Sequence, residues 1–123
     1  MSNFPNNLKY NKDFSWIKVE EDVATIGITQ LAASKVEEFV FLILPKKGAI
    51  KIGDTYATAE AIKWSGHFSS PIKGEVIEVN DAVFDSPSLI NEDAYSNWIA
   101  KIKIEEIEEL MDHEEAIKHY SKL

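Results

Sequence analysis

The stretch that decides the fold is Ala59-Glu60-Ala61-Ile62-Lys63-Trp64-Ser65-Gly66. Two β-like segments flank it, residues 55–62 leading up to Lys63 and residues 67–72 leading away from it. The pattern predicts a β-hairpin with Lys63 at its tip. A lysine in this position suits a covalently attached cofactor, because its flexible side chain stands clear of the protein body.

Composition places the chain among soluble globular proteins. It has 123 residues, of which 45% are hydrophobic and 28% are charged, so we expect a single domain over residues 1–123. The longest apolar run, residues 39–44, is far shorter than the ~20 residues of a membrane span. Residues 1–5 lack the basic region and apolar stretch of a signal peptide, so the expected location is cytoplasmic.

Charge and cysteine content exclude several classes of function. The net charge is −8 and the chain has no arginine, which argues against nucleic-acid binding. Cysteine is absent, so disulfides, thiolate nucleophiles and Cys-ligated metals are excluded. His113 and His119 do not share a helix face, and we expect no metal site. No P-loop, dinucleotide fingerprint or nucleophile elbow is present, and we expect a protein that is not an enzyme.

The remaining pattern predicts many short strands and a terminal helix, typical of a small β barrel or sandwich. Turn signals stand at Glu20-Glu21-Asp22, Gly53-Asp54 and Lys73-Gly74. The predicted strands are 16–19, 23–28, 39–44, 55–62, 67–72, 75–80 and 98–103. The predicted helices are 29–35 capped by Thr29, a short one to Asn91 capped by Ser86, and 104–121 at the C-terminus.

From Leu8 onward the chain resembles the lipoyl-carrying H proteins of the glycine cleavage system. The matching segments are Leu8-Lys9-Tyr10 with Trp16, 22–29, 41–45 with Gly48, Glu60 with Lys63, 74–80, and Pro87, 89–93, Tyr95, Trp98 and 101–103. The resemblance implies a mainly β fold, the lipoyl/biotinyl-type barrel-sandwich hybrid, with short helices and a C-terminal helix.

The same resemblance implies a function for individual residues. It implies that lipoate is amide-linked to Lys63, and that Glu60 and Gly74 are recognised by lipoate-attaching enzymes. The implied partners are a lipoate ligase or transferase, a dihydrolipoyl dehydrogenase, a glycine decarboxylase and an aminomethyltransferase. The chain would then be a carrier that shuttles a bound intermediate between enzymes.

The resemblance fails around the lipoyl arm. The chain has Phe14-Ser15 where the family has His-Glu, Lys35 where it often has histidine, and Trp64 to His67 where it has Ala-Ala/Thr-Ser-Asp. A lost carboxylate would remove a charge-assisted hydrogen bond of about 1.5–3 kcal/mol from a cationic aminomethyl load. We therefore expect Ser15, Lys35 and His67 to weaken aminomethyl carriage.

These substitutions favour a second carrier hypothesis. H-protein-like lipoate-binding proteins also serve a sulfur-oxidising pathway built around a heterodisulfide-reductase-like complex. An anionic sulfur load would tolerate His67 and Lys35 better than a carboxylate would.

Other interpretations stay open. The chain could be an unmodified interaction module, and a biotin carrier is disfavoured because Ile62 and Trp64 replace the usual methionines. Trp64 either covers apolar surface at the turn or contacts the dithiolane or a partner. Glu60 could be an ordinary exposed strand charge, and a hairpin position need not bring His67 near the tip.

Overall fold

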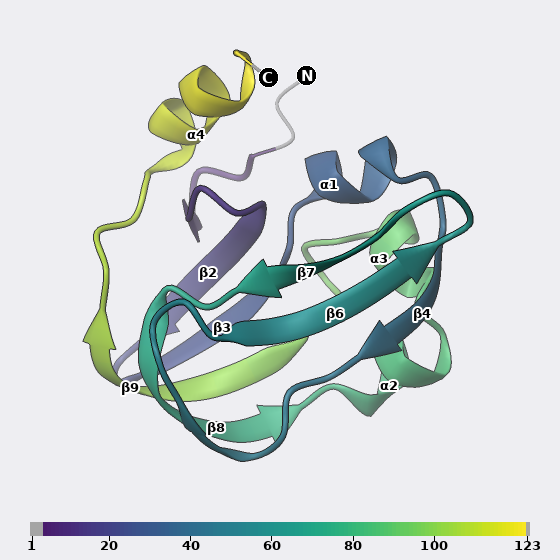
Figure 1. Cartoon of the computed structure of the whole chain (residues 1–123). Coiled ribbons are helices and arrows are strands. Elements are labelled where there is room, and N and C mark those ends of the chain that lie inside the picture. The colour runs from purple at the N-terminus through teal and green to yellow at the C-terminus, as the bar shows by residue number, and fades with distance from the viewer. Residues whose placement is uncertain (1–3, 123) are drawn as a thin grey trace.

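Two β-sheets form the body of the protein. The structure is a computed structural model and describes residues 4–122. Residues 1–3 and 123 lie outside the described residues. They include the two ends of the expected domain and part of the segment in which a signal peptide would lie. One sheet has the strand order β1-β2-β3-β9-β8-β5 and the other has the order β4-β6-β7. Figure 1 shows the smaller sheet lying across the larger one.

The six-stranded sheet consists of β1 (Lys9–Tyr10), β2 (Ser15–Glu20), β3 (Val23–Ile28), β5 (Gly48–Ile50), β8 (Ile72–Val79) and β9 (Ala100–Ile107). The three-stranded sheet consists of β4 (Phe39–Ile43), β6 (Thr55–Ala61) and β7 (Ser65–Ser69). The helices are α1 (Gln30–Lys35), α2 (Asp81–Asp85), α3 (Leu89–Glu92) and α4 (His113–Tyr120).

Apolar side chains from both sheets form the main core. Strand side chains alternate between two faces, and each sheet directs one of its faces toward the other sheet. The largest fully buried members include Ile17, Ile26, Leu42, Tyr56, Ile72 and Ile102. A second cluster, in which Phe4, Tyr10, Trp16, Met111 and Tyr120 are buried, attaches α4 to β1 and β2. Figure 1 shows α4 at one end of the molecule, joined to β9 by an extended segment.

The predicted helix over residues 104–121 is wrong in its first half. Strand β9 continues to Ile107, because Ile104 pairs with Gly74, Glu106 with Lys73, and Ile107 with Ile72 of β8. The helix begins only at His113, where Asp112 caps it in a capping box with Glu115. The apparent helical face of glutamates is therefore largely an exposed strand end and a connecting segment.

Other boundaries also differ from the prediction. The expected turn at Lys73-Gly74 is wrong, because both residues lie within β8 and the chain reverses before it, at Ser70-Pro71. Helix α3 begins at Leu89, so the predicted cap Ser86 lies too early in the chain to be its N-cap. The short elements β1, β5 and α2 were not predicted; Asn80 caps α2 by accepting a hydrogen bond from the N–H of Ala82.

Within the described residues, no helix combines the length and the apolar character that crossing a membrane requires.

Candidate functional site

Lys63 lies at the apex of the hairpin formed by β6 and β7. The pairing runs from Thr55 with Ser69 up to Glu60 with Ser65. The N–H of Ala61 then donates to the carbonyl oxygen of Trp64 at 2.7 Å and closes the turn. Ile62 and Lys63 are the two residues between this hydrogen-bonded pair, and both are exposed. The predicted hairpin with Lys63 at its tip is therefore confirmed, on a rigid base of paired strands.

The two faces of this hairpin differ in chemistry. Side chains alternate along a strand, so Ala59, Ala61 and Phe68 face inward and are buried. Glu60 and His67 face outward and are exposed. Glu60 has Phe41 and Ser65 as its register neighbours, and His67 has Thr58.

Trp64 lies over the backbone of β7. A Cβ atom added to Gly66 would stand 2.6 Å from Cζ2 of Trp64, so the indole occupies the space that any side chain at position 66 would need. The ring centroid lies 5.9 Å from that of Phe68 and 6.4 Å from that of Phe39. Trp64 is nevertheless 37% exposed, so part of the residue remains open to solvent.

A groove of about 200 Å³ begins at this indole. We call it the Trp64 groove; it is lined by Phe14, Ala32, Lys35, Val36, Trp64 and Phe68. Lys35 is the only charged residue among these lining residues, at the end of α1. The groove can accept an apolar chain, and its single charged group would favour a neutral or anionic group over a cation.

The structure brings together only some of the predicted arm-flanking residues. Trp64 and Lys35 both line the Trp64 groove. His67 lies on the opposite face of β7 from Phe68 and outside the groove. An arm would contact His67 only by lying across the outer face of the sheet.

Ser15 belongs to a buried hydrogen-bond network and not to the groove. Its hydroxyl shares a hydrogen bond of 2.5 Å with the hydroxyl of Tyr56, which also donates to the carbonyl oxygen of Gly27 at 3.2 Å. Burial raises the pKa of Tyr56 well above its ordinary value. Sequence reasoning missed four of the groove residues, namely Phe14, Ala32, Val36 and Phe68. Nothing in the local pattern places Phe14, the neighbour of Ser15, beside residues 32–36 and 64–68.

Gly74 is required by packing between two strands. A Cβ atom there would lie 1.8 Å from the carbonyl oxygen of Lys103 in β9, closer than any real contact. The register of β8 and β9 shifts between Lys73 and Gly74, which brings the two backbones together. This close approach explains why residue 74 is glycine, whatever an attaching enzyme also recognises.

The described residues contain no group of three histidine or carboxylate side chains arranged to hold a metal ion.

Comparison with known proteins identifies the family. The family model described as glycine cleavage H-protein matches residues 8–123. The chain is 43% identical over 118 residues to the glycine cleavage system H protein of Escherichia coli, covering 91% of this chain and 92% of that protein. It is 40% identical over 116 residues to a probable glycine cleavage system H protein of Thermoplasma volcanium, with 94% and 95% covered.

A solved structure agrees with this result. The crystal structure of a glycine cleavage system H protein from Mycobacterium marinum superposes with a TM-score of 0.91 at 25% identity, covering 96% of this chain and 99% of that one. The expected mainly β fold, a barrel-sandwich hybrid with a C-terminal helix, is confirmed by this likeness. The chain belongs to the glycine cleavage H-protein family, whose members are non-catalytic carrier proteins.

Proposed function

We propose that this chain is a lipoyl carrier of the glycine cleavage system, with lipoate amide-linked to Lys63. The observation that carries the proposal is the position of Lys63, exposed at the apex of a two-residue turn and next in sequence to Trp64 of the groove. An attaching enzyme can reach the amine there without unfolding the strands on either side.

The Trp64 groove fits the apolar part of such a group. Its lining is almost entirely aromatic and aliphatic, so a hydrocarbon chain and a dithiolane ring would leave water there without losing hydrogen bonds. When attached, lipoate supplies the disulfide chemistry that a chain without cysteine lacks.

The protein's own residues anchor and position the arm. The paired strands of the hairpin hold Lys63 at a fixed distance from the body, and the tether keeps the arm at high effective concentration beside a docked enzyme. The apolar side chains of Trp64 and Phe68 line the groove and would exclude water from the arm's end. The carrier therefore shelters its load between encounters and performs no chemistry on it.

The proposed partners follow from this role. A lipoate ligase or transferase would modify Lys63, a glycine decarboxylase and an aminomethyltransferase would load and unload the arm, and a dihydrolipoyl dehydrogenase would reoxidise it. Glu60 suits recognition by these enzymes because it stands exposed on the outer face of the hairpin beside Phe41, which is 43% exposed. Gly74 would contribute to recognition indirectly, by keeping the strands around it in register.

A second candidate load is an oxidised sulfur species passed to a heterodisulfide-reductase-like complex. One observation favours it, since Lys35 is a cation and no carboxylate lines the Trp64 groove. The position of His67 outside the groove weakens the argument made from that residue, and all the relatives described above are glycine cleavage H proteins. The comparisons therefore do not support the sequence-based preference for sulfur oxidation, and glycine cleavage is the primary proposal.

Isotope exchange separates the two loads. Fully lipoylated protein is mixed with glycine decarboxylase, glycine and labelled bicarbonate, with Lys63→Arg as the unmodifiable control. Glycine cleavage predicts label in glycine with the wild-type protein and none with the control. If the lipoylated protein supports no exchange, the glycine cleavage proposal fails and the sulfur load becomes the better explanation.

A further inference from the structure

Phe14, one lining residue of the Trp64 groove, has an unusual backbone conformation. Its φ is 57°, in the left-handed region that bulky residues rarely adopt. Two hydrogen bonds hold it there. Its N–H donates to the hydroxyl of Tyr120 at 2.8 Å, and its carbonyl oxygen accepts from the N–H of Thr29 at 2.9 Å. The conformation therefore depends on a residue of α4 and on the residue that caps α1.

Tyr120 contacts this segment in three ways. Besides accepting from Phe14, its hydroxyl donates to the carbonyl oxygen of Asn11 at 2.7 Å. Its ring centroid lies 4.8 Å from that of Phe14. The side chain is only 5% exposed, and burial raises its pKa to about 12, so the hydroxyl remains protonated at neutral pH. One tyrosine thus fixes both the backbone and the ring of Phe14.

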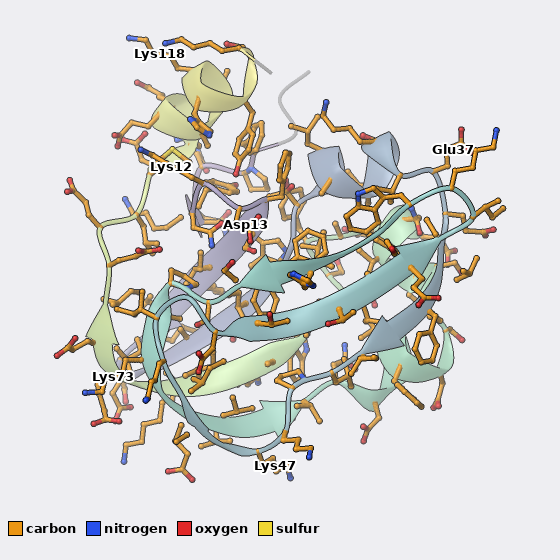
Figure 2. The ribbon with its side chains drawn as sticks, in the orientation of Figure 1. Lys12, Asp13, Glu37, Lys47, Lys73 and Lys118 are labelled. Atoms are coloured by element: carbon orange, nitrogen blue, oxygen red, sulfur yellow. The ribbon has the colours of Figure 1, made fainter. Side chains whose placement is uncertain are left out.

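The same segment is joined to the lysine hairpin. The carboxylate of Asp13 accepts from the N–H of Ser69 at 2.6 Å and from its hydroxyl at 2.8 Å, and Figure 2 shows Asp13 between β2 and β7. The side-chain amide of Asn11 donates to the carbonyl oxygen of Ser69 at 3.2 Å. Ser69 follows Phe68 directly in β7, so the segment and this groove residue are held in a fixed relation.

Helix α1 completes the connection. Thr29, which donates to Phe14, caps α1 by accepting from the N–H of Ala32 at 3.3 Å. Ala32 and Lys35 of α1 line the groove. The short segment that Tyr120 holds is therefore hydrogen-bonded both to β7, which carries Phe68, and to the cap of α1, which carries Ala32 and Lys35.

We propose that Tyr120 is a positioning residue for the lipoyl arm, acting through Phe14 to fix the shape of the Trp64 groove. This inference rests on the proposed function, because it takes the groove to be the shelter of the arm. Loss of the hydroxyl leaves the N–H of Phe14 without its acceptor. The segment then relaxes from positive φ toward the ordinary regions, and the ring leaves the groove. The C-terminal helix is in this way a component of the arm site, although it lies outside the hairpin.

The test compares Tyr120→Phe with Tyr10→Phe. Both variants remove one hydroxyl from a buried tyrosine of the same apolar cluster. The hydroxyl of Tyr10, however, donates to the carbonyl oxygen of Pro5, whereas that of Tyr120 accepts from the N–H of Phe14. Unmodified protein labelled with fluorotryptophan is studied by fluorine NMR, with Trp64→Phe assigning the resonance. The proposal predicts that the Trp64 resonance shifts in Tyr120→Phe and stays in place in Tyr10→Phe.

Lipoylated protein gives the second measurement, the rate at which a water-soluble phosphine reduces the arm's disulfide. Tyr120→Phe should raise this rate about fivefold, the effect of losing the one hydrogen bond that holds the N–H of Phe14, whereas Tyr10→Phe should leave it unchanged. A rate and a Trp64 resonance that are the same in both variants would overturn the proposal.

A further variant keeps the test decisive if Tyr120→Phe fails to fold. Phe14→Asn removes the ring but tolerates positive φ and retains the N–H that donates to Tyr120. It should accelerate reduction to a similar extent, and an unchanged rate would equally contradict the proposal. If Lys63 carries no lipoate, the proposed function fails. The NMR comparison on unmodified protein would still show whether Tyr120 fixes the surroundings of Trp64.

Discussion

Replacing Gly66 by alanine should change the free energy of unfolding in opposite directions, depending on the residue at position 64. In the wild-type protein an alanine Cβ at position 66 would stand 2.6 Å from Cζ2 and 3.0 Å from Cη2 of Trp64. The backbone of Gly66 is not in the left-handed region, so alanine itself is compatible with this strand position. The only obstacle is the indole ring.

The magnitude follows from two opposing terms. Forcing a packed side chain to move costs about 1–3 kcal/mol. Replacing glycine by alanine within a strand raises the free energy of unfolding by about 0.5–1 kcal/mol, because the unfolded chain loses conformational entropy. The two terms together predict that Gly66→Ala lowers the free energy of unfolding when Trp64 is present, by about 1 kcal/mol at their midpoints and by about 2.5 kcal/mol at most. In a Trp64→Ala background only the favourable term remains, and Gly66→Ala should raise that free energy by about 0.5–1 kcal/mol.

The assay is urea unfolding of the four proteins of this double-mutant cycle, followed by far-ultraviolet circular dichroism so that loss of a tryptophan does not change the signal. The prediction is a reversal of sign between the two backgrounds. If Gly66→Ala lowers the free energy of unfolding equally in both, Trp64 does not lie over β7 as described. The arrangement of the groove would then have to be revised.

Three further predictions concern stability. Gly74→Ala should lower the free energy of unfolding by about 3 kcal/mol or more, since the obstructing atom is the backbone oxygen of Lys103 and cannot rotate away; an unchanged urea midpoint would leave enzyme recognition as the sole role of Gly74. Asp112→Ala should cost about 0.5–2 kcal/mol by removing the α4 capping box, whereas the exposed Glu114→Ala in the same turn should cost much less, and equal urea midpoints would contradict this. Burial raises the pKa of Tyr56, so the neutral phenol contributes fully to the free energy of unfolding below about pH 10. This contribution is lost as the pH rises toward the pKa of Tyr56 in the folded state. Urea unfolding at increasing alkaline pH should show a decline that is shallower in Tyr56→Phe, and identical slopes would refute the assignment.

The hairpin and the fold could be predicted because their signals are local. Strand-forming residues on both sides of Lys63 determine the hairpin, and the matched segments before and after it determine the family. The Trp64 and Gly66 pair was also readable in principle. Residues two apart lie on one face of a strand, and glycine leaves room for a large neighbour.

The helix over 104–121 was mispredicted because strand pairing is a long-range interaction. Ile107, Leu110 and Met111 have helical spacing, and nothing local shows that Ile107 pairs with Ile72. The local signal that was available is the capping box of Asp112 and Glu115, which marks the true start of α4.

The groove lay beyond sequence reasoning for a similar reason. Its walls come from the loop before β2, from α1 and the residue after it, from the hairpin turn and from β7, and only the folded chain brings Phe14, Val36 and Phe68 together. Alternation along β7 does predict that His67 and Phe68 face opposite sides of the sheet. This local pattern already argues against a position of His67 beside an arm that lies in the groove.

The most direct test of the carrier proposal is mass spectrometry of the protein isolated from its native source under lipoate-replete growth. We expect the peptide containing Lys63 to carry the mass increment of one lipoyl amide, and every other lysine to be unmodified. An unmodified Lys63, or lipoate attached to a different lysine, would contradict it.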